Sequence, residues 1–190
     1  MPRPTILLFL VVAVAACAGP APPASFDPGG PCVGDGSAIG AYPELEAKVP
    51  TRFEDVAPET LDSGRKCTPD GLGSLAQAGF ADVRFAGGTW GFGGNRAAAL
   101  VVFSAPGLTA EAMADFYTGS ARAANRTRVT AESSPTLAGR PGHRIDTVTG
   151  SRQQTVVVWP GATTDVVNVV ITNDLPDPKI EAAVAAFGGQ

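Results

Sequence analysis

The sequence predicts a single α+β domain with a mainly antiparallel sheet and helices packed on one or both faces. Four strand-like segments follow one another between residues 128 and 172, and short turns containing Gly, Pro, Ser or Asp separate them. This succession is typical of an antiparallel meander. Two segments with helical periodicity, 109–124 and 177–187, flank the four strands. Their apolar faces can cover such a sheet.

The four predicted strands differ in how deeply they should be buried. Gln154–Trp159 and Asp165–Thr172 contain almost unbroken apolar runs, which favours burial on both faces. Arg128–Glu132 and His143–Thr149 are more polar. Upstream of these four, the pattern predicts further extended segments at Val83–Ala86, at Ala98–Ala105 and around Phe53 and Val56.

The helix expected over 109–124 has the clearest start signal. Thr109 is a suitable N-cap, and Leu108 and Met113 occupy the positions of a hydrophobic staple. Met113, Phe116 and Tyr117 share one face, which should pack on the sheet.

Three other segments carry weaker helix signals. Pro43–Val49 predicts a short helical turn. Thr68 followed by Pro69 predicts a helix that Gly79 ends. Asp177 followed by Pro178 predicts the N-terminus of a final helix that stops at Gly188.

Composition excludes several kinds of site. The 190 residues carry a net charge of −4, with one His and three Cys. An acidic chain is a poor candidate for binding nucleic acid. One His and so few Cys cannot build a His-rich metal site, so we expect no metal and no cofactor.

The N-terminus has the pattern of a bacterial export signal. Arg3 precedes an unbroken apolar run from Ile6 to Ala16, which is too short to span a membrane and fits a signal peptide. The run ends in Val14-Ala15-Ala16-Cys17, which resembles the lipobox of bacterial lipoproteins. The resemblance implies removal of residues 1–16 and a diacylglycerol on the Cys17 thiol. It also implies an outward-facing, membrane-anchored protein.

Residues 17–31 are predicted to link that anchor to the folded domain at 32–190. Five of the fourteen residues at 18–31 are Pro and three are Gly, a composition typical of a semi-extended linker. An ordinary signal peptide with Cys17 left as a free thiol is the alternative interpretation of the N-terminus.

The two remaining cysteines, Cys32 and Cys67, form an even pair in a chain predicted to be exported. Such a pair predicts a disulfide, which would contribute roughly 4 kcal/mol in the chain-entropy model for this loop length. Two free, redox-active thiols are the alternative, although the chain has no Cys-x-x-Cys spacing.

The Gly-rich segment at 88–94 contains Trp90 and Phe92. These aromatic residues are the predicted contacts with a glycan, lipid or protein partner, if the segment is a mobile loop that presents them. In the alternative interpretation the segment is a wide hairpin and its aromatic side chains fold back onto the core.

Other polar residues suggest sites less strongly. The chain has no Gly-x-Ser-x-Gly motif that could supply a nucleophile beside His143. We therefore expect His143 to be a solvent-facing residue of a strand. Asp174 and Asp177 could ligate calcium, although Asp177 fits a helix cap better. Paired carboxylates at Glu44 with Glu46 and at Glu54 with Asp55 could in principle act on a sugar.

Five arginines follow one another in the second half of the chain. They could gather to hold an anionic group, or they could be scattered and solvated. The five are Arg122, Arg126, Arg128, Arg140 and Arg144.

The element order resembles that of the Mog1/PsbP-like domains found in some cell-envelope lipoproteins. The leading hypothesis is a lipid-anchored, non-enzymatic domain that binds an envelope protein, glycan or lipid. A carrier of a lipid or small apolar ligand, with a cavity near Met113, Phe116 and Trp159, is the first alternative. A carboxylate-based glycan hydrolase is the second.

Overall fold

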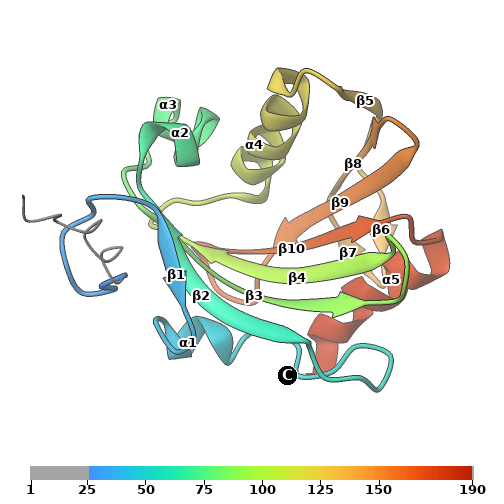
Figure 1. The fold of residues 1–190 in the computed structure, drawn as a ribbon, viewed down its shortest axis with the longest axis horizontal. Coiled ribbons are helices and arrows are strands. Elements are labelled where there is room, and N and C mark those ends of the chain that lie inside the picture. Colours follow the sequence, from blue (N-terminus) through green and yellow to red (C-terminus); the bar gives the residue numbers. More distant parts are fainter. Residues whose placement is uncertain (1–25, 190) are drawn as a thin grey trace, which may run out of the picture.

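The computed structural model describes residues 26–189 and is built on one antiparallel sheet of eight strands (Figure 1). The strands lie in the order β1-β2-β3-β4-β10-β9-β8-β5, and a separate small sheet pairs β6 with β7. In chain order the strands are β1 (Gly36–Ala38), β2 (Thr60–Lys66), β3 (Val83–Gly91), β4 (Ala97–Ser104), β5 (Thr127–Ser133), β6 (Thr136–Leu137), β7 (Arg140–Pro141), β8 (His143–Thr149), β9 (Arg152–Pro160) and β10 (Val166–Asn173).

Helices cover both faces of the large sheet, which confirms the predicted α+β class. One face packs against α4 and the short helices α2 and α3, and the other packs against α1 and α5 (Figure 1). The helices are α1 (Pro43–Glu46), α2 (Pro69–Leu72), α3 (Ser74–Gln77), α4 (Ala110–Ala123) and α5 (Asp177–Ala186), followed by a 3-10 turn at Phe187–Gly189.

Helix α4 carries the chain from the middle of the sheet to its edge. The chain leaves β4, crosses the sheet face in α4 and enters the edge strand β5 (Figure 1). It then returns strand by strand through β8, β9 and β10 until β10 pairs with β4, with Val169 opposite both Val101 and Val158. The predicted meander of four strands is therefore confirmed.

The central strands have apolar side chains on both faces. In β4, Leu100 and Val102 belong to the core under α1 and α5, whereas Val101 and Phe103 belong to the core under α4. The same alternation in β9 places Trp159 on the α5 face. Burying each large side chain contributes about 1.5–3 kcal/mol, which explains why these strands are nearly continuous apolar runs.

Three local predictions were wrong. The helix expected from Thr68 to Gly79 is broken into α2 and α3, because Gly73 adopts φ 52° between them. Thr68 still caps α2 by accepting a hydrogen bond from the Gly71 amide at 3.0 Å. Phe53 and Val56 bond to each other across a tight turn and do not form a longer strand.

The third error concerns the start of α5. Asp177 is the first residue of the helix, and the N-cap position is held by Pro176 without a side-chain cap. The Asp177 carboxylate instead accepts a hydrogen bond from the Arg144 guanidinium at 2.8 Å. The predicted apolar face of this helix is confirmed, because Ile180 and Val184 are buried.

Strand β2 was not predicted, because its sequence is polar. Ser63 is fully buried, and its hydroxyl accepts from the Tyr42 amide at 2.7 Å and donates to the Glu46 carboxylate at 2.8 Å. Gly64 packs so tightly against β1 that a Cβ atom there would lie 2.2 Å from the Gly36 carbonyl oxygen. The hydrogen bonds of Ser63 and the close packing of Gly64, rather than an apolar periodicity, hold this strand in the sheet.

The segment at 26–31 packs on the folded domain, ahead of the predicted boundary at residue 32. The guanidinium of Arg65, a buried residue of β2, donates to the carbonyls of Asp27 and Pro31, each at 3.1 Å. It also lies 5.7 Å from the centre of the Phe26 ring. This end of the predicted linker is therefore part of the folded unit.

The contribution of the α4 N-cap to stability can be tested directly. The Thr109 hydroxyl accepts from the Ala112 amide at 3.1 Å, and loss of such a cap costs about 1 kcal/mol. Thr109→Ala should lower the free energy of unfolding by that amount in urea titrations, whereas Thr109→Ser should keep most of it. Equal free energies of unfolding for all three proteins would show that the Thr109 cap does not stabilise the fold.

Candidate functional site

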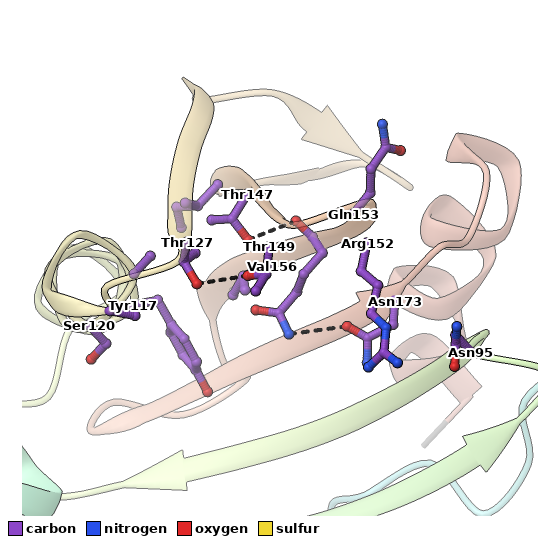
Figure 2. Close-up of a pocket in the computed structure, with 14 residues that line it drawn as sticks. Asn95, Tyr117, Ser120, Thr127, Thr147, Thr149, Arg152, Gln153, Val156 and Asn173 are labelled. Carbon is purple, nitrogen blue, oxygen red and sulfur yellow. Dashed lines mark hydrogen bonds between the residues drawn. The ribbon is translucent and has the colours of Figure 1, made fainter.

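A cavity of about 520 Å³ lies between the second half of α4 and the ends of β8, β9 and β10 (Figure 2). Its volume is within the usual range of small-molecule sites. Polar side chains line much of it, with Tyr117 and Ser120 at one end and Asn95, Arg152 and Asn173 at the other (Figure 2).

Strand register arranges the polar floor of this cavity in two rows. In one row Thr147 of β8 is opposite Gln154 of β9, which is opposite Asn173 of β10. The amide nitrogen of Gln154 donates to the amide oxygen of Asn173 at 3.1 Å. Because cross-strand neighbours point to the same face, these three side chains lie side by side.

The second row lies one step closer to the strand ends. Thr149 of β8 is opposite both Thr127 of β5 and Arg152 of β9. The hydroxyls of Thr127 and Thr149 share a hydrogen bond at 2.7 Å (Figure 2). On the other side of the first row, Ile145 and Val156 form an apolar end of the floor.

Tyr117 supplies the aromatic part of the wall. Its ring extends from α4 into the space between the helix and the strands (Figure 2), and it packs edge-on against Phe103 and Phe116. Burial raises the pKa of the Tyr117 hydroxyl above its usual range, so the group stays protonated. This hydroxyl has no hydrogen-bond partner among residues 26–189.

The lining offers hydrogen bonds but little charge. Arg152 is the only ionisable side chain in it besides Tyr117, and it forms no ion pair with the residues described. No Asp, Glu or His lines the cavity. The arrangement can orient and hold a polar molecule, but its own residues supply no general acid or base of ordinary pKa.

Sequence reasoning did not identify this cavity. Its polar residues are spread over four strands, α4 and the β3–β4 turn. Only the strand register brings Thr147, Gln154 and Asn173 together. The available signal was Thr and Gln at strand ends that are otherwise rich in Val, and the pairing of those ends cannot be read from one sequence.

The structure places Trp90 inside the core, with 2% of its surface exposed. Gly87 to Gly91 belong to β3, and the Trp90 indole donates to the Val56 carbonyl at 2.9 Å. Gly88 makes this possible, because a Cβ atom there would lie 2.9 Å from the indole ring. This is the arrangement expected if the aromatic side chains fold back onto the core.

Phe92 lies beside Trp90 and is half-buried. Its ring packs edge-on against Phe53 with 5.5 Å between the ring centres, and the Lys179 ammonium lies 4.8 Å from its centre. Both aromatic residues lie with the core under α1 and α5, on the opposite face of the sheet from the cavity beside α4.

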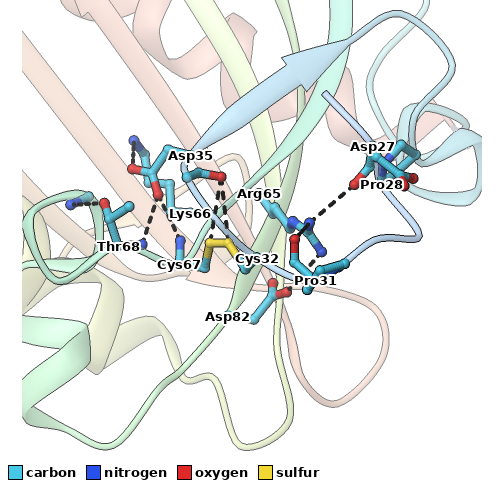
Figure 3. Close-up of a disulfide and its surroundings, with 12 residues drawn as sticks. Asp27, Pro28, Pro31, Cys32, Asp35, Arg65, Lys66, Cys67, Thr68 and Asp82 are labelled. Atoms are coloured by element: carbon cyan, nitrogen blue, oxygen red, sulfur yellow. Dashed lines mark hydrogen bonds and ion pairs between the residues drawn. A yellow bond between two sulfur atoms is a disulfide. The ribbon is translucent and has the colours of Figure 1, made fainter. Parts of the chain in front are cut away.

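Cys32 and Cys67 form the predicted disulfide, with their Cα atoms 6.2 Å apart (Figure 3). Cys67 stands between the end of β2 and the N-cap of α2. The bond therefore fixes the chain after Pro31 to the sheet, next to the carbonyl groups that Arg65 holds (Figure 3).

Asp35 reinforces this attachment. Its carboxylate accepts from the Cys67 amide at 2.8 Å and from the Thr68 amide at 2.9 Å, and the Lys66 ammonium lies 4.0 Å away. Burial by itself would raise the pKa of Asp35, but these hydrogen bonds and the Lys66 charge outweigh it and lower the pKa below its usual value.

The cavity predicted for a carrier cannot exist as described. Met113 belongs to the core under α4, whereas Trp159 belongs to the core under α5. The sheet separates these two residues, so they cannot line one cavity together with Phe116.

Several other candidate residues are engaged in separate contacts. The Asp174 carboxylate accepts a hydrogen bond from the backbone amide of Gln153 at 2.8 Å, and the Asp177 carboxylate accepts one from the Arg144 guanidinium. Glu46 holds Ser63 and the Gly40 amide, and Glu54 forms an ion pair with Lys179. Within residues 26–189, no group of three or more His, Cys, Asp or Glu side chains could hold a metal ion.

His143 and the five arginines form no common site. His143 is half-buried in β8 and makes no hydrogen bond to a described Ser or carboxylate. Arg122 pairs with Glu132, and Arg144 pairs with Asp146 and Asp177. Such an arrangement fits scattered structural and solvated roles better than one anion site.

The residues that resemble a lipobox, including Cys17, lie outside the described residues. In the described part of the chain, no helix is both long and apolar enough to cross a membrane. No family model matches the chain, and no curated protein matches it.

The disulfide yields one stability prediction. Replacing both Cys32 and Cys67 by Ser should lower the free energy of unfolding by roughly 4 kcal/mol, because the bond closes a loop with a sequence separation of 35. Urea titration measures this loss. The unaltered protein in the presence of a reductant should unfold like the double variant, and an unchanged midpoint would contradict the prediction.

Asp35 yields a pH-dependent prediction. Because its folded-state pKa lies below the unfolded value of about 3.9, the carboxylate stabilises the fold above about pH 4. That contribution is lost as the pH falls through the folded-state pKa. Asp35→Asn should cost about 1–2 kcal/mol at pH 7, and the difference from the unaltered protein should shrink toward pH 3.

The matched control for this measurement is Asp115→Asn, an exposed residue of α4 without a hydrogen bond or ion pair to the described residues. Urea titrations of both variants at several pH values would compare them. The same pH profile for the two variants would contradict the role given to Asp35.

Proposed function

We propose that this chain is a lipid-anchored, extracytoplasmic domain that binds a polar component of the cell envelope without chemically changing it. The anchor in this proposal is the lipid on Cys17. The binding site is the cavity between α4 and the ends of β8, β9 and β10.

The anchoring part of the proposal rests on the N-terminal residues and the disulfide. Val14-Ala15-Ala16-Cys17 follows a short apolar run, and the domain carries the Cys32–Cys67 bond. Disulfides persist outside the reducing cytoplasm, so the bond agrees with export. Two or three acyl chains on one Cys would hold the domain at a membrane without an amphipathic helix.

The lining of the cavity supports the binding part. Thr127, Thr149, Gln154 and Asn173 present hydroxyl and amide groups that are already paired with one another. This pairing fixes their positions before a ligand arrives, which reduces the entropy cost of binding. It is the single observation on which the binding proposal depends most.

The two alternative functions have less support. A glycan hydrolase needs two carboxyl groups across a cleft, and the lining of this cavity contains none. A carrier of an apolar ligand would bury the polar rows against hydrocarbon, which costs free energy for every hydrogen bond left unmade.

Replacement of Cys17 tests the anchor. Cys17→Ser should prevent lipid attachment, so the protein should no longer carry acyl mass and should leave the membrane fraction. The Cys32→Ser/Cys67→Ser protein is the matched control, because it loses two cysteines but keeps the lipidated one. Intact-mass measurement and membrane fractionation check both proteins, and acyl mass remaining on Cys17→Ser would overturn the proposed anchor.

A further inference from the structure

We infer that the cavity beside α4 binds a neutral saccharide. The inference deepens the proposed function and rests on it, because it names the ligand class of the same binding site. It is carried by two rows of paired hydroxyl and amide groups that adjoin an aromatic and aliphatic surface.

The polar rows match the chemistry of sugar hydroxyls. After Gln154 donates to Asn173, Gln154 keeps its amide oxygen and one N–H, and Asn173 keeps both N–H groups. The Thr127–Thr149 pair likewise keeps unused lone pairs. A sugar hydroxyl both donates and accepts, so one hydroxyl can satisfy neighbouring donors and acceptors on such a floor.

The other end of the cavity suits the C–H face of a sugar ring. Tyr117 and Ala121 of α4 supply the accessible apolar surface at that end, because Ile145 and Val156 are each only 2% exposed. The aromatic ring reaches into the cavity (Figure 2). The Tyr117 hydroxyl has no partner in the described part of the chain, so it is available for a ligand hydroxyl. A saccharide has an apolar ring face and a rim of hydroxyls, which match the apolar end and the hydrogen-bonding end of this lining.

The lining offers no charge partner to a cationic ligand. No carboxylate in the cavity could bind a cationic group. Arg152 is exposed at one end, and its guanidinium can donate to hydroxyls as well as to an anion. A fatty acyl chain fits poorly, because the Thr147–Gln154–Asn173 row would lose hydrogen bonds to water without replacement.

Ligand-observed saturation-transfer NMR on the full acylated protein tests this inference. The protein should be held in a detergent without a sugar head group, and the probes are glucose, N-acetylglucosamine, maltose and cellobiose. At least one probe should receive saturation. Gln154→Ala should weaken its binding about three- to tenfold, as expected for one lost hydrogen bond.

Gln153→Ala is the matched control. Gln153 is the neighbour of Gln154 in β9, and its side chain points away from the other lining residues (Figure 2). This variant should bind like the unaltered protein. Tyr117→Phe keeps the ring but removes the hydroxyl, so it provides a second variant that should weaken binding without emptying the core.

Three results would overturn the inference. They are no saturation of any of the four probes, equal binding by the Gln154→Ala and Gln153→Ala proteins, or displacement of the sugar by a fatty acid at equal concentration. Each of these leaves the Cys17 experiment unaffected, so failure of the saccharide inference is distinguishable from failure of the proposed anchor.

Discussion

The pairing of β10 with β4 is the constraint on which the rest of the structure depends. These strands are far apart in the sequence, and all eight residues of β10 are in register with β4. For the pair to form, the chain must leave β4, reach the opposite edge of the sheet and return through β5, β8 and β9. Helix α4 makes that crossing, and it covers one face of the returning strands as it does so.

The candidate site is a consequence of where α4 ends. The helix finishes at Ala123, and the chain turns directly into the edge strand β5. The rows beneath its middle are apolar, as at Ile145 and Val156, whereas the rows beyond its end are polar. The helix thus covers the apolar rows of these strands and leaves the polar rows beyond its end open. This geometry produces a cavity with an apolar end and a hydrogen-bonding end.

Sequence patterns were sufficient wherever burial was strong and local. Helix α4 could be predicted from the helical spacing of Met113, Phe116 and Tyr117. The covered strands β9 and β10 could be predicted from their almost unbroken apolar runs, and the meander from the short turns between its strands. Strand β2 could not, because Ser63 and Arg65 are buried through hydrogen bonds to Tyr42, Asp27 and Pro31. Those partners are identified only once the fold is known.

The site residues divide in the same way. The disulfide followed from counting cysteines in a chain predicted to be exported. Trp90 and Phe92 were ambiguous in sequence, because glycine neighbours suit both a loop and a strand that an indole ring approaches closely. The polar floor was missed altogether, since Thr147, Gln154 and Asn173 become neighbours only through the register of three strands.

The most direct experiment is a native mass spectrum of the protein isolated from its own membrane. We expect cleavage before Cys17, acyl mass on that residue and a bound species that leaves on gentle activation with a mass composed of sugar units. A bound phospholipid or fatty acid in place of the sugar would contradict the assignment of the cavity. A chain that still contains residues 1–16 and carries no acyl mass would contradict the anchor.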